Sequence, residues 1–198
     1  MTVALDIEHL ITERMEESME VSNSLLQNAH FVTLVSDVGL AMTQSLRNGG
    51  TVFFFGNGGS AADAQHLAAE LAGRYLIERR PLRGVALNTN TSCLTAIGND
   101  YGYDLVFARQ LEALGLPGDV AVGISTSGNS RNVLRALEVA KEKEMITVGM
   151  TGGRGGELRQ LVDYCVCISS DQTPRIQEAH IMIGHILCEI VEQQLFAP

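Results

Sequence analysis

Apolar residues recur every three or four positions through residues 7–48, and this spacing predicts two helices. The first helix would carry Ile7, Leu10, Ile11 and Met15 on one face, and the second Leu34, Val38, Ala41, Met42 and Leu46. Gly49 and Gly50 follow the second run, and glycine commonly ends a helix. The chain therefore begins with an N-terminal helical pair.

After residue 50 the pattern changes to short apolar runs that alternate with amphipathic helices. The five runs are Val52–Phe55, Gly84–Leu87, Val120–Ile124, Ile146–Met150 and Tyr164–Ile168. Runs of this length between helices are typical of parallel strands that are buried on both faces. We therefore predict an α/β fold: an open, five-stranded parallel sheet flanked by helices, of the flavodoxin-like kind.

The last predicted helix begins near Pro174, because proline is favoured in the first turn, and continues to about Leu195. Its apolar face is broad, with Ile181, Ile183, Ile186, Leu187, Ile190 and Val191. Together with the N-terminal pair, this surface suggests contacts with other subunits. The alternative is a helix that is covered within its own domain.

The 198 residues, 45% of them hydrophobic, are enough for one core. We expect a single domain over 1–198, with helices 1–50 used in oligomer packing and an α/β core over 51–198. No signal peptide or membrane span is evident, so a cytoplasmic protein without membrane contact is expected. The net charge of -9 argues against a nucleic-acid partner.

The four cysteines, Cys93, Cys165, Cys167 and Cys188, have no CxxC spacing. A zinc ribbon or a redox dithiol is therefore not indicated. Free, partly buried thiols are expected.

The segment Gly56–Ser60 follows the first predicted strand and precedes a helix predicted over Ala61–Leu76. Its glycines allow a ligand to approach the backbone closely, and Ser60 could cap the helix or donate to a phosphate. With Ala61 the segment also matches the dinucleotide pattern GxGxxA. That pattern expects an acid after the second strand, where this chain has Asn88-Thr89-Asn90, so a nicotinamide or flavin enzyme is a minor alternative.

A second loop, Ser125–Ser130, follows the third predicted strand and opens a helix predicted over Asn132–Lys143. Four hydroxyl groups at a helix N-terminus favour a site for one phosphate. An ordinary N-cap would need only one of them. No GK[ST] follows, so the loop is not a P-loop for a nucleoside triphosphate.

His66 and Glu70 are four residues apart on one helix and share a face. Gln177 and His185 are eight apart in the last helix, about 12 Å along its axis. Such groups can form a metal site or an acid/base pair. Equally, His66 and Glu70 can be an exposed pair and His185 a core histidine. One ion shared by Gln177 and His185 would need both side chains to stretch, which favours a ligand from a neighbouring subunit.

Four motifs in order carry a family resemblance: GNGGSAADAQH from Gly56, LTAIGNDYG from Leu94, GISTSGNS from Gly123 and RIQEAHIMIGH from Arg175. Over nearly the whole chain the sequence resembles the sugar isomerase (SIS) superfamily, and within it the phosphoheptose isomerases. The resemblance implies a homotetrameric aldose-ketose isomerase that converts D-sedoheptulose 7-phosphate to D-glycero-D-manno-heptose 7-phosphate through an enediol. This reaction is the first step toward ADP-heptose for surface polysaccharide.

The resemblance also implies roles for individual residues. Glu70 and His185 match the family's catalytic pair, and His66, Glu70, Gln177 and His185 match the ligands of one zinc ion per subunit. The expected substrate-binding residues are Asn57, Gly58, Gly59, Ser60, Glu70, Asn99, Asp100, Ser125, Thr126, Ser127, Ser130 and Gln177. Ser60 is included because of its place in the first loop. Whether zinc takes part in turnover or only steadies the site stays open.

Two other members of the superfamily are alternatives. A replication-initiator-associated SIS protein, which is not an enzyme, shares both loops, but it lacks the glutamate and histidine at positions 70 and 185. An SIS sugar-phosphate sensor would need a DNA-binding module, for which this chain has no room. Glu70 and His185 therefore favour the enzyme.

Overall fold

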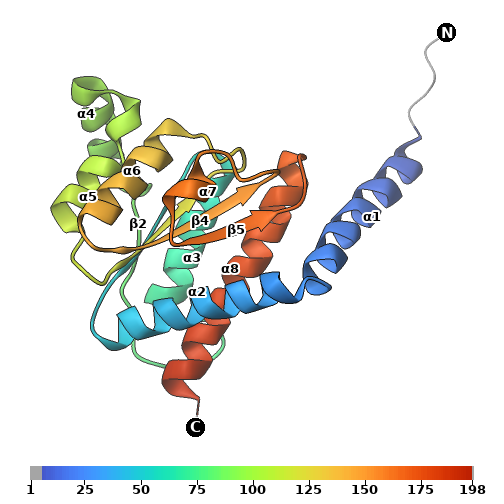
Figure 1. The fold of residues 1–198 in the computed structure, drawn as a ribbon, viewed down its shortest axis with the longest axis horizontal. Helices are drawn as coiled ribbons and strands as arrows, with labels where there is room; N and C mark the ends of the chain where they lie inside the picture. Colours follow the sequence, from blue (N-terminus) through green and yellow to red (C-terminus); the bar gives the residue numbers. More distant parts are fainter. Residues whose placement is uncertain (1–5, 198) are drawn as a thin grey trace.

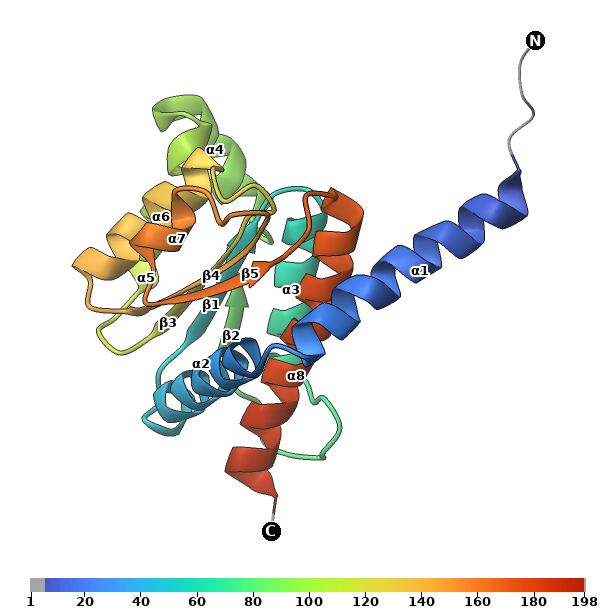
Figure 2. The ribbon, with the colours of Figure 1, turned by 45° about the vertical axis from the view of Figure 1, so that its right-hand side comes forward.

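The computed structural model describes residues 6–197, which form three layers with the sheet between two layers of helices, as Figure 1 and Figure 2 show. The parallel strands are β1 (Val52–Gly56), β2 (Gly84–Ala86), β3 (Val120–Ile124), β4 (Ile146–Gly152) and β5 (Tyr164–Ile168), in the order β2-β1-β3-β4-β5. This is the flavodoxin-like order, so the predicted fold class is confirmed. Residues 1–5 and 198, which the predicted domain includes, lie outside the described residues.

Alternate residues of the central strands face opposite layers of helices, which is why these strands are largely apolar. Val52 and Phe54 belong to a core beneath α2 (Ala29–Arg47), α3 (Gly59–Ala72) and α8 (Thr173–Phe196). Phe53 and Phe55 face the opposite layer. That layer consists of α4 (Thr91–Tyr101), a 3-10 turn at Tyr103–Leu105, α5 (Ala108–Leu114), α6 (Arg131–Glu142) and α7 (Leu158–Leu161).

The two N-terminal helices differ in their burial. Helix α2 packs against α8 and buries Phe31, Val35, Val38 and Met42 in the core. Helix α1 (Ile7–Leu26) has one fully buried residue, Leu25, and projects from the body of the molecule (Figure 2). Helix α2 therefore packs on the sheet, whereas α1 is mostly exposed and contacts α8 and α2. The use of residues 1–50 in oligomer packing stays a prediction.

Two simpler expectations can be compared with the described residues. Cys93, Cys165, Cys167 and Cys188 are all free, as predicted. Between residues 6 and 197, every helix is too short or too polar to cross a bilayer.

Candidate functional site

The two predicted ligand loops meet at the carboxyl edge of the sheet, where β1 and β3 end side by side. They follow β1 and β3, which are neighbours and between which the strand order reverses. Ligands of open α/β sheets bind outside the carboxyl ends of strands at such a point. Asn57 of the first loop and Asn132 at the start of α6 exchange amide hydrogen bonds of 2.9 and 2.8 Å. The loops are therefore joined directly.

The first loop is short because α3 begins at Gly59. Gly58 is the N-cap and has a φ of +57°, a conformation that favours glycine. Ser60 lies within the first turn, 3% exposed, and does not cap the helix. The amide of Gln177 packs so closely on Gly59 that a Cβ there would overlap it. Gln177 of α8 is thus beside the N-terminus of α3.

The second loop orders its hydroxyl groups among themselves. Ser125 donates to the Oγ of Ser130 over 2.9 Å, and Ser127 Oγ accepts the N–H of Asn129 over 3.2 Å. Thr126 and Ser127 also line a polar pocket of about 420 Å³, whose other walls are the loops after β4 and β5 and the start of α8. Hydroxyl and N–H groups at the start of α6 suit an anion.

Asn99 and Asp100 lie on the exposed surface of α4. Asn99 donates to Asp100 Oδ1 over 2.8 Å, and neither residue hydrogen-bonds to the two loops within residues 6–197. Tyr103, three residues after Asp100, does contact the first loop, since its hydroxyl donates to Asn57 Oδ1 over 3.4 Å. The structure therefore does not bring this predicted pair to the loops.

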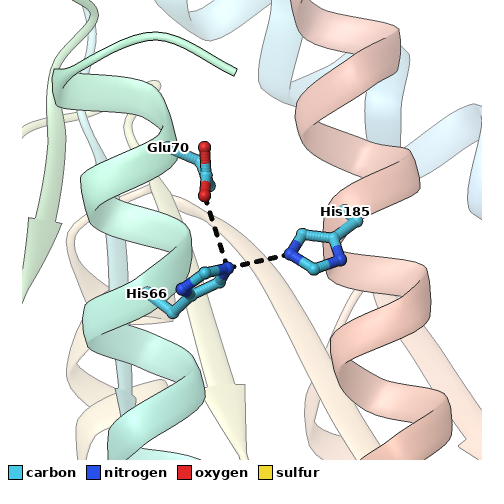
Figure 3. A group of neighbouring side chains, drawn as sticks. All are labelled: His66, Glu70 and His185. Atoms are coloured by element: carbon cyan, nitrogen blue, oxygen red, sulfur yellow. Dashed lines mark hydrogen bonds and ion pairs between the residues drawn. The ribbon is translucent and has the colours of Figure 1, made fainter. Parts of the chain in front are cut away.

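His66 and Glu70 of α3 point toward His185 of α8 (Figure 3). The Nε2 atoms of the two histidines are 2.8 Å apart, and Glu70 Oε1 lies 3.3 Å from His66 Nε2. One ligand atom from each of the three residues lies within 4.8 Å of the others. Two imidazole nitrogens and a carboxylate oxygen are a common donor set for zinc, so the cluster fits a metal ion.

The four predicted metal ligands are divided. His66, Glu70 and His185 come together within one chain, whereas Gln177 is beside Gly59. The separation follows from α8 itself, because eight residues rise about 12 Å. Spacing alone favoured a neighbouring subunit as the source of Gln177 or His185, but His185 joins the cluster within its own chain.

Two residues near the cluster were not singled out from the sequence. Asp63 precedes His66 by three positions and Glu70 by seven, so helical spacing would have found it. It is half-buried; burial raises the pKa of its carboxyl, while the imidazoles of His66 and His185 act in the opposite direction. Tyr75, beyond the end of α3, stacks on His185, and no local pattern indicates that contact.

The contacts of Asn88 bear on the dinucleotide-binding alternative. Asn88 lies two residues after β2, in the region where that pattern expects a ribose-binding acid. Its Nδ2 donates to the carbonyl of Gly56 over 2.8 Å. The amide thus ties two strand ends together.

The fold and the two loops are those of a sugar isomerase (SIS) domain. The SIS domain family matches residues 21–152 of this chain, which therefore belongs to that family. Phosphoheptose isomerase 2 of Campylobacter jejuni is 51% identical over 91% of this chain and 90% of the relative. The phosphoheptose isomerase of Rhodospirillum rubrum is 58% identical over 81% and 86%. Within the SIS family, the chain belongs with the phosphoheptose isomerases, which are sugar-phosphate isomerases.

A solved structure agrees with this placement. The phosphoheptose isomerase of Neisseria gonorrhoeae superposes with a TM-score of 0.89 at 41% identity, covering 94% of this chain and all but 1% of the other. The replication-initiator-associated alternative is therefore not favoured.

Proposed function

We propose that this chain interconverts D-sedoheptulose 7-phosphate and D-glycero-D-manno-heptose 7-phosphate, and so begins the route to ADP-heptose for surface polysaccharide. The observation that carries the proposal is the cluster of His66, Glu70 and His185, which offers a base beside an imidazole. The named activity of the relatives supplies the substrate.

The reaction moves a proton between adjacent carbons through an enediol. One base on one face of the sugar is sufficient, because it can remove the proton from one carbon and return it to the next. We assign this role to Glu70. His185 acts on oxygen: it assists ring opening and protonates the oxyanion that develops at the carbonyl.

Zinc is the metal that we propose for the cluster, at one ion per subunit. His66, Glu70 and His185 would hold it. Gln177 would complete the set only by leaving Gly59 and stretching along α8 toward His185, about 12 Å away, or by coming from a neighbouring chain. When bound, zinc would polarise a sugar oxygen as a Lewis acid. A carboxylate that ligates zinc is a weaker base, so Glu70 would have to leave the metal to act on the sugar proton.

We propose that the substrate phosphate binds at the loop after β3, where Ser125, Thr126, Ser127 and Ser130 gather at the start of α6. Asn57 and Gly58 of the loop after β1 and Gly59 and Ser60 at the start of α3 support the sugar together with Gln177. Asn99 and Asp100 would reach it only if α4 moved toward the loops, because they do not hydrogen-bond to them within residues 6–197. The support for the phosphate site is the hydroxyl-rich N-terminus of α6 and its joining to the first loop.

A homotetramer in the cytoplasm is the assembly that we propose. Helix α1 exposes the apolar side chains of Ile7, Ile11, Met15, Met19 and Leu26. An apolar groove of about 470 Å³ lies between α1, α2 and α8, lined among others by Phe31, Val35 and Ile186. A second copy of this chain would cover both surfaces.

The deciding experiment incubates the purified protein with sedoheptulose 7-phosphate and follows the sugar by NMR. The anomeric signals of a new aldose 7-phosphate are expected, together with exchange of solvent deuterium at C2. Sedoheptulose without phosphate is the control and should react far more slowly. If neither sugar changes, the proposed activity is wrong.

A further inference from the structure

The imidazole of His185 lies between two other rings. On one side is His66, with ring centroids 5.0 Å apart and the planes at 68°. On the other side is Tyr75, with centroids 5.7 Å apart and the planes at 27°, a stacked arrangement. Stacked and edge-to-face contacts of this kind restrain ring orientation as well as position.

Tyr75 is on the segment after α3, and a buried carboxylate fixes this segment. Glu192 accepts the backbone N–H groups of Tyr75, Leu76 and Ile77 over 3.0, 2.6 and 2.7 Å. It also pairs with Arg79 Nε over 2.8 Å, and both of these side chains are only 1% exposed. Four donors satisfy a charge that would otherwise be costly to bury.

The same pair connects this segment to both helices of the cluster. Glu192 comes seven residues after His185, two turns further along the same side of α8. Arg79 Nη2 donates to the backbone carbonyl of Glu70 over 2.8 Å. One element, α8, therefore carries His185 and also the carboxylate that holds the tyrosine stacked on it.

We propose that Tyr75 is a positioning residue for His185, and that its ring face, held by Glu192 and Arg79, keeps the imidazole turned toward His66 and Glu70. The inference rests on the proposed role of His185. The tyrosine hydroxyl has no part in it, because the stacking uses the ring alone. Without the ring, His185 would gain rotamers that point away from the cluster.

The test compares Tyr75→Leu, which removes the aromatic face, with Tyr75→Phe, which keeps it. Tyr75→Leu should lower kcat about 10- to 100-fold, the usual loss when a group that orients an active-site imidazole is removed. KM should stay within about twofold of the unmodified value, because substrate binding is unaffected. Tyr75→Phe should retain kcat within about threefold, by the same reasoning from ring stacking.

Three results would overturn the inference: unchanged kcat in Tyr75→Leu, equal losses in both variants, or a loss confined to KM. If Tyr75→Leu does not fold, NMR of the unmodified protein decides, since ring protons of Tyr75 and His185 should show a mutual NOE. Its absence overturns the inference. His185→Gln separates the two proposals: if this variant is fully active, the proposed role of His185 fails, whatever Tyr75 does.

Discussion

Two histidines five positions apart on α8 have opposite environments. His180 is 1% exposed, bonded through Nε2 to the carbonyl of Thr151 over 3.1 Å, with Nδ1 buried and unpaired within the described residues. His185 is half-buried and faces the cluster. Five residues turn about 140° around a helix, so the two rings lie on different sides. The alternative that His185 is a core histidine is thus wrong, and the buried histidine of α8 is His180, which the sequence analysis did not single out.

His180 gives a pH-dependent stability. Burial lowers its pKa to about 4, against the opposing effect of the Thr151 carbonyl. Between that value and 6.5 the unfolded chain binds a proton that the folded chain does not, so stability falls as the pH drops through this window. Over the whole window the free energy of unfolding falls by about 3 kcal/mol. Urea unfolding at pH 7 and pH 4.5 measures it. His180→Gln should flatten this contribution, whereas the exposed control His30→Gln should leave it unchanged.

Glu70 is the residue on which the chemistry depends most directly. Glu70→Gln keeps the size of the side chain and removes its basicity, so kcat should fall at least about 100-fold while KM changes little. Steady-state kinetics and isotope exchange at C2 measure the effect. Glu78→Gln is the matched control, because that side chain is 88% exposed beyond the end of α3. A Glu70→Gln enzyme with near-normal kcat contradicts the assignment.

At the scale of one loop and helix, the segment after β3 should determine phosphate affinity. Ser127→Ala removes a donor to a charged group and should weaken sugar-phosphate binding by about 1 to 3 kcal/mol. Ser130→Ala should do the same and also removes the partner of Ser125. Calorimetry with the sugar phosphate and with inorganic phosphate measures both. Unchanged affinity in the two variants would place the phosphate elsewhere.

The end of α3 depends on Glu192 for its stability. Glu192→Gln leaves Arg79 buried without a counter-charge and replaces an acceptor of three N–H groups by a neutral one. The free energy of unfolding should fall by about 2 to 5 kcal/mol, as for other broken buried pairs. Glu189→Gln, on the exposed side of the same helix, is the control. Equal stability of both variants in urea would contradict this account.

Local patterns predicted the elements better than their ends. The runs Val120–Ile124 and Tyr164–Ile168 are β3 and β5 residue for residue. The helix predicted to Leu76 ends at Ala72 instead, because Gly73 interrupts it and the following N–H groups bond to Glu192, more than 110 residues away. No local pattern contains such a partner.

The candidate site was predictable to the same degree. Spacing placed His66 and Glu70 on one face of α3, and this holds in the structure. The approach of His185 depends on how α8 packs on α3, and Gly184 permits that packing, since a Cβ there would overlap Leu67. The spacing of residues along the sequence cannot predict such tertiary contacts, and the stacking of Tyr75 on His185 is another of them.

At the scale of the whole molecule, the cluster and the loops are far apart along α3. The helix begins at the first loop with Gly59, and Glu70 comes eleven residues later, about 16 Å along the axis. A seven-carbon sugar phosphate bound at the loops would have to stretch along the helix to reach its own Glu70. Helix α1 and the apolar groove expose apolar surface that neighbouring copies of the chain would cover. We therefore expect the cluster of one chain to work with the loops of another.

Mixing inactive variants tests this arrangement. Glu70→Gln destroys the cluster and leaves the loops intact, whereas Ser127→Asp repels phosphate and leaves the cluster intact. If each site takes its cluster and loops from different chains, random exchange of subunits gives about a quarter of the sites both intact halves, and activity returns. The control mixes Glu70→Gln with His185→Ala, whose altered residues share one cluster, so activity should stay absent. Recovery of activity in the control would mean that the cluster itself is divided between chains. If the first mixture does not recover activity although mass spectrometry proves that subunits have exchanged, the whole site lies on one chain.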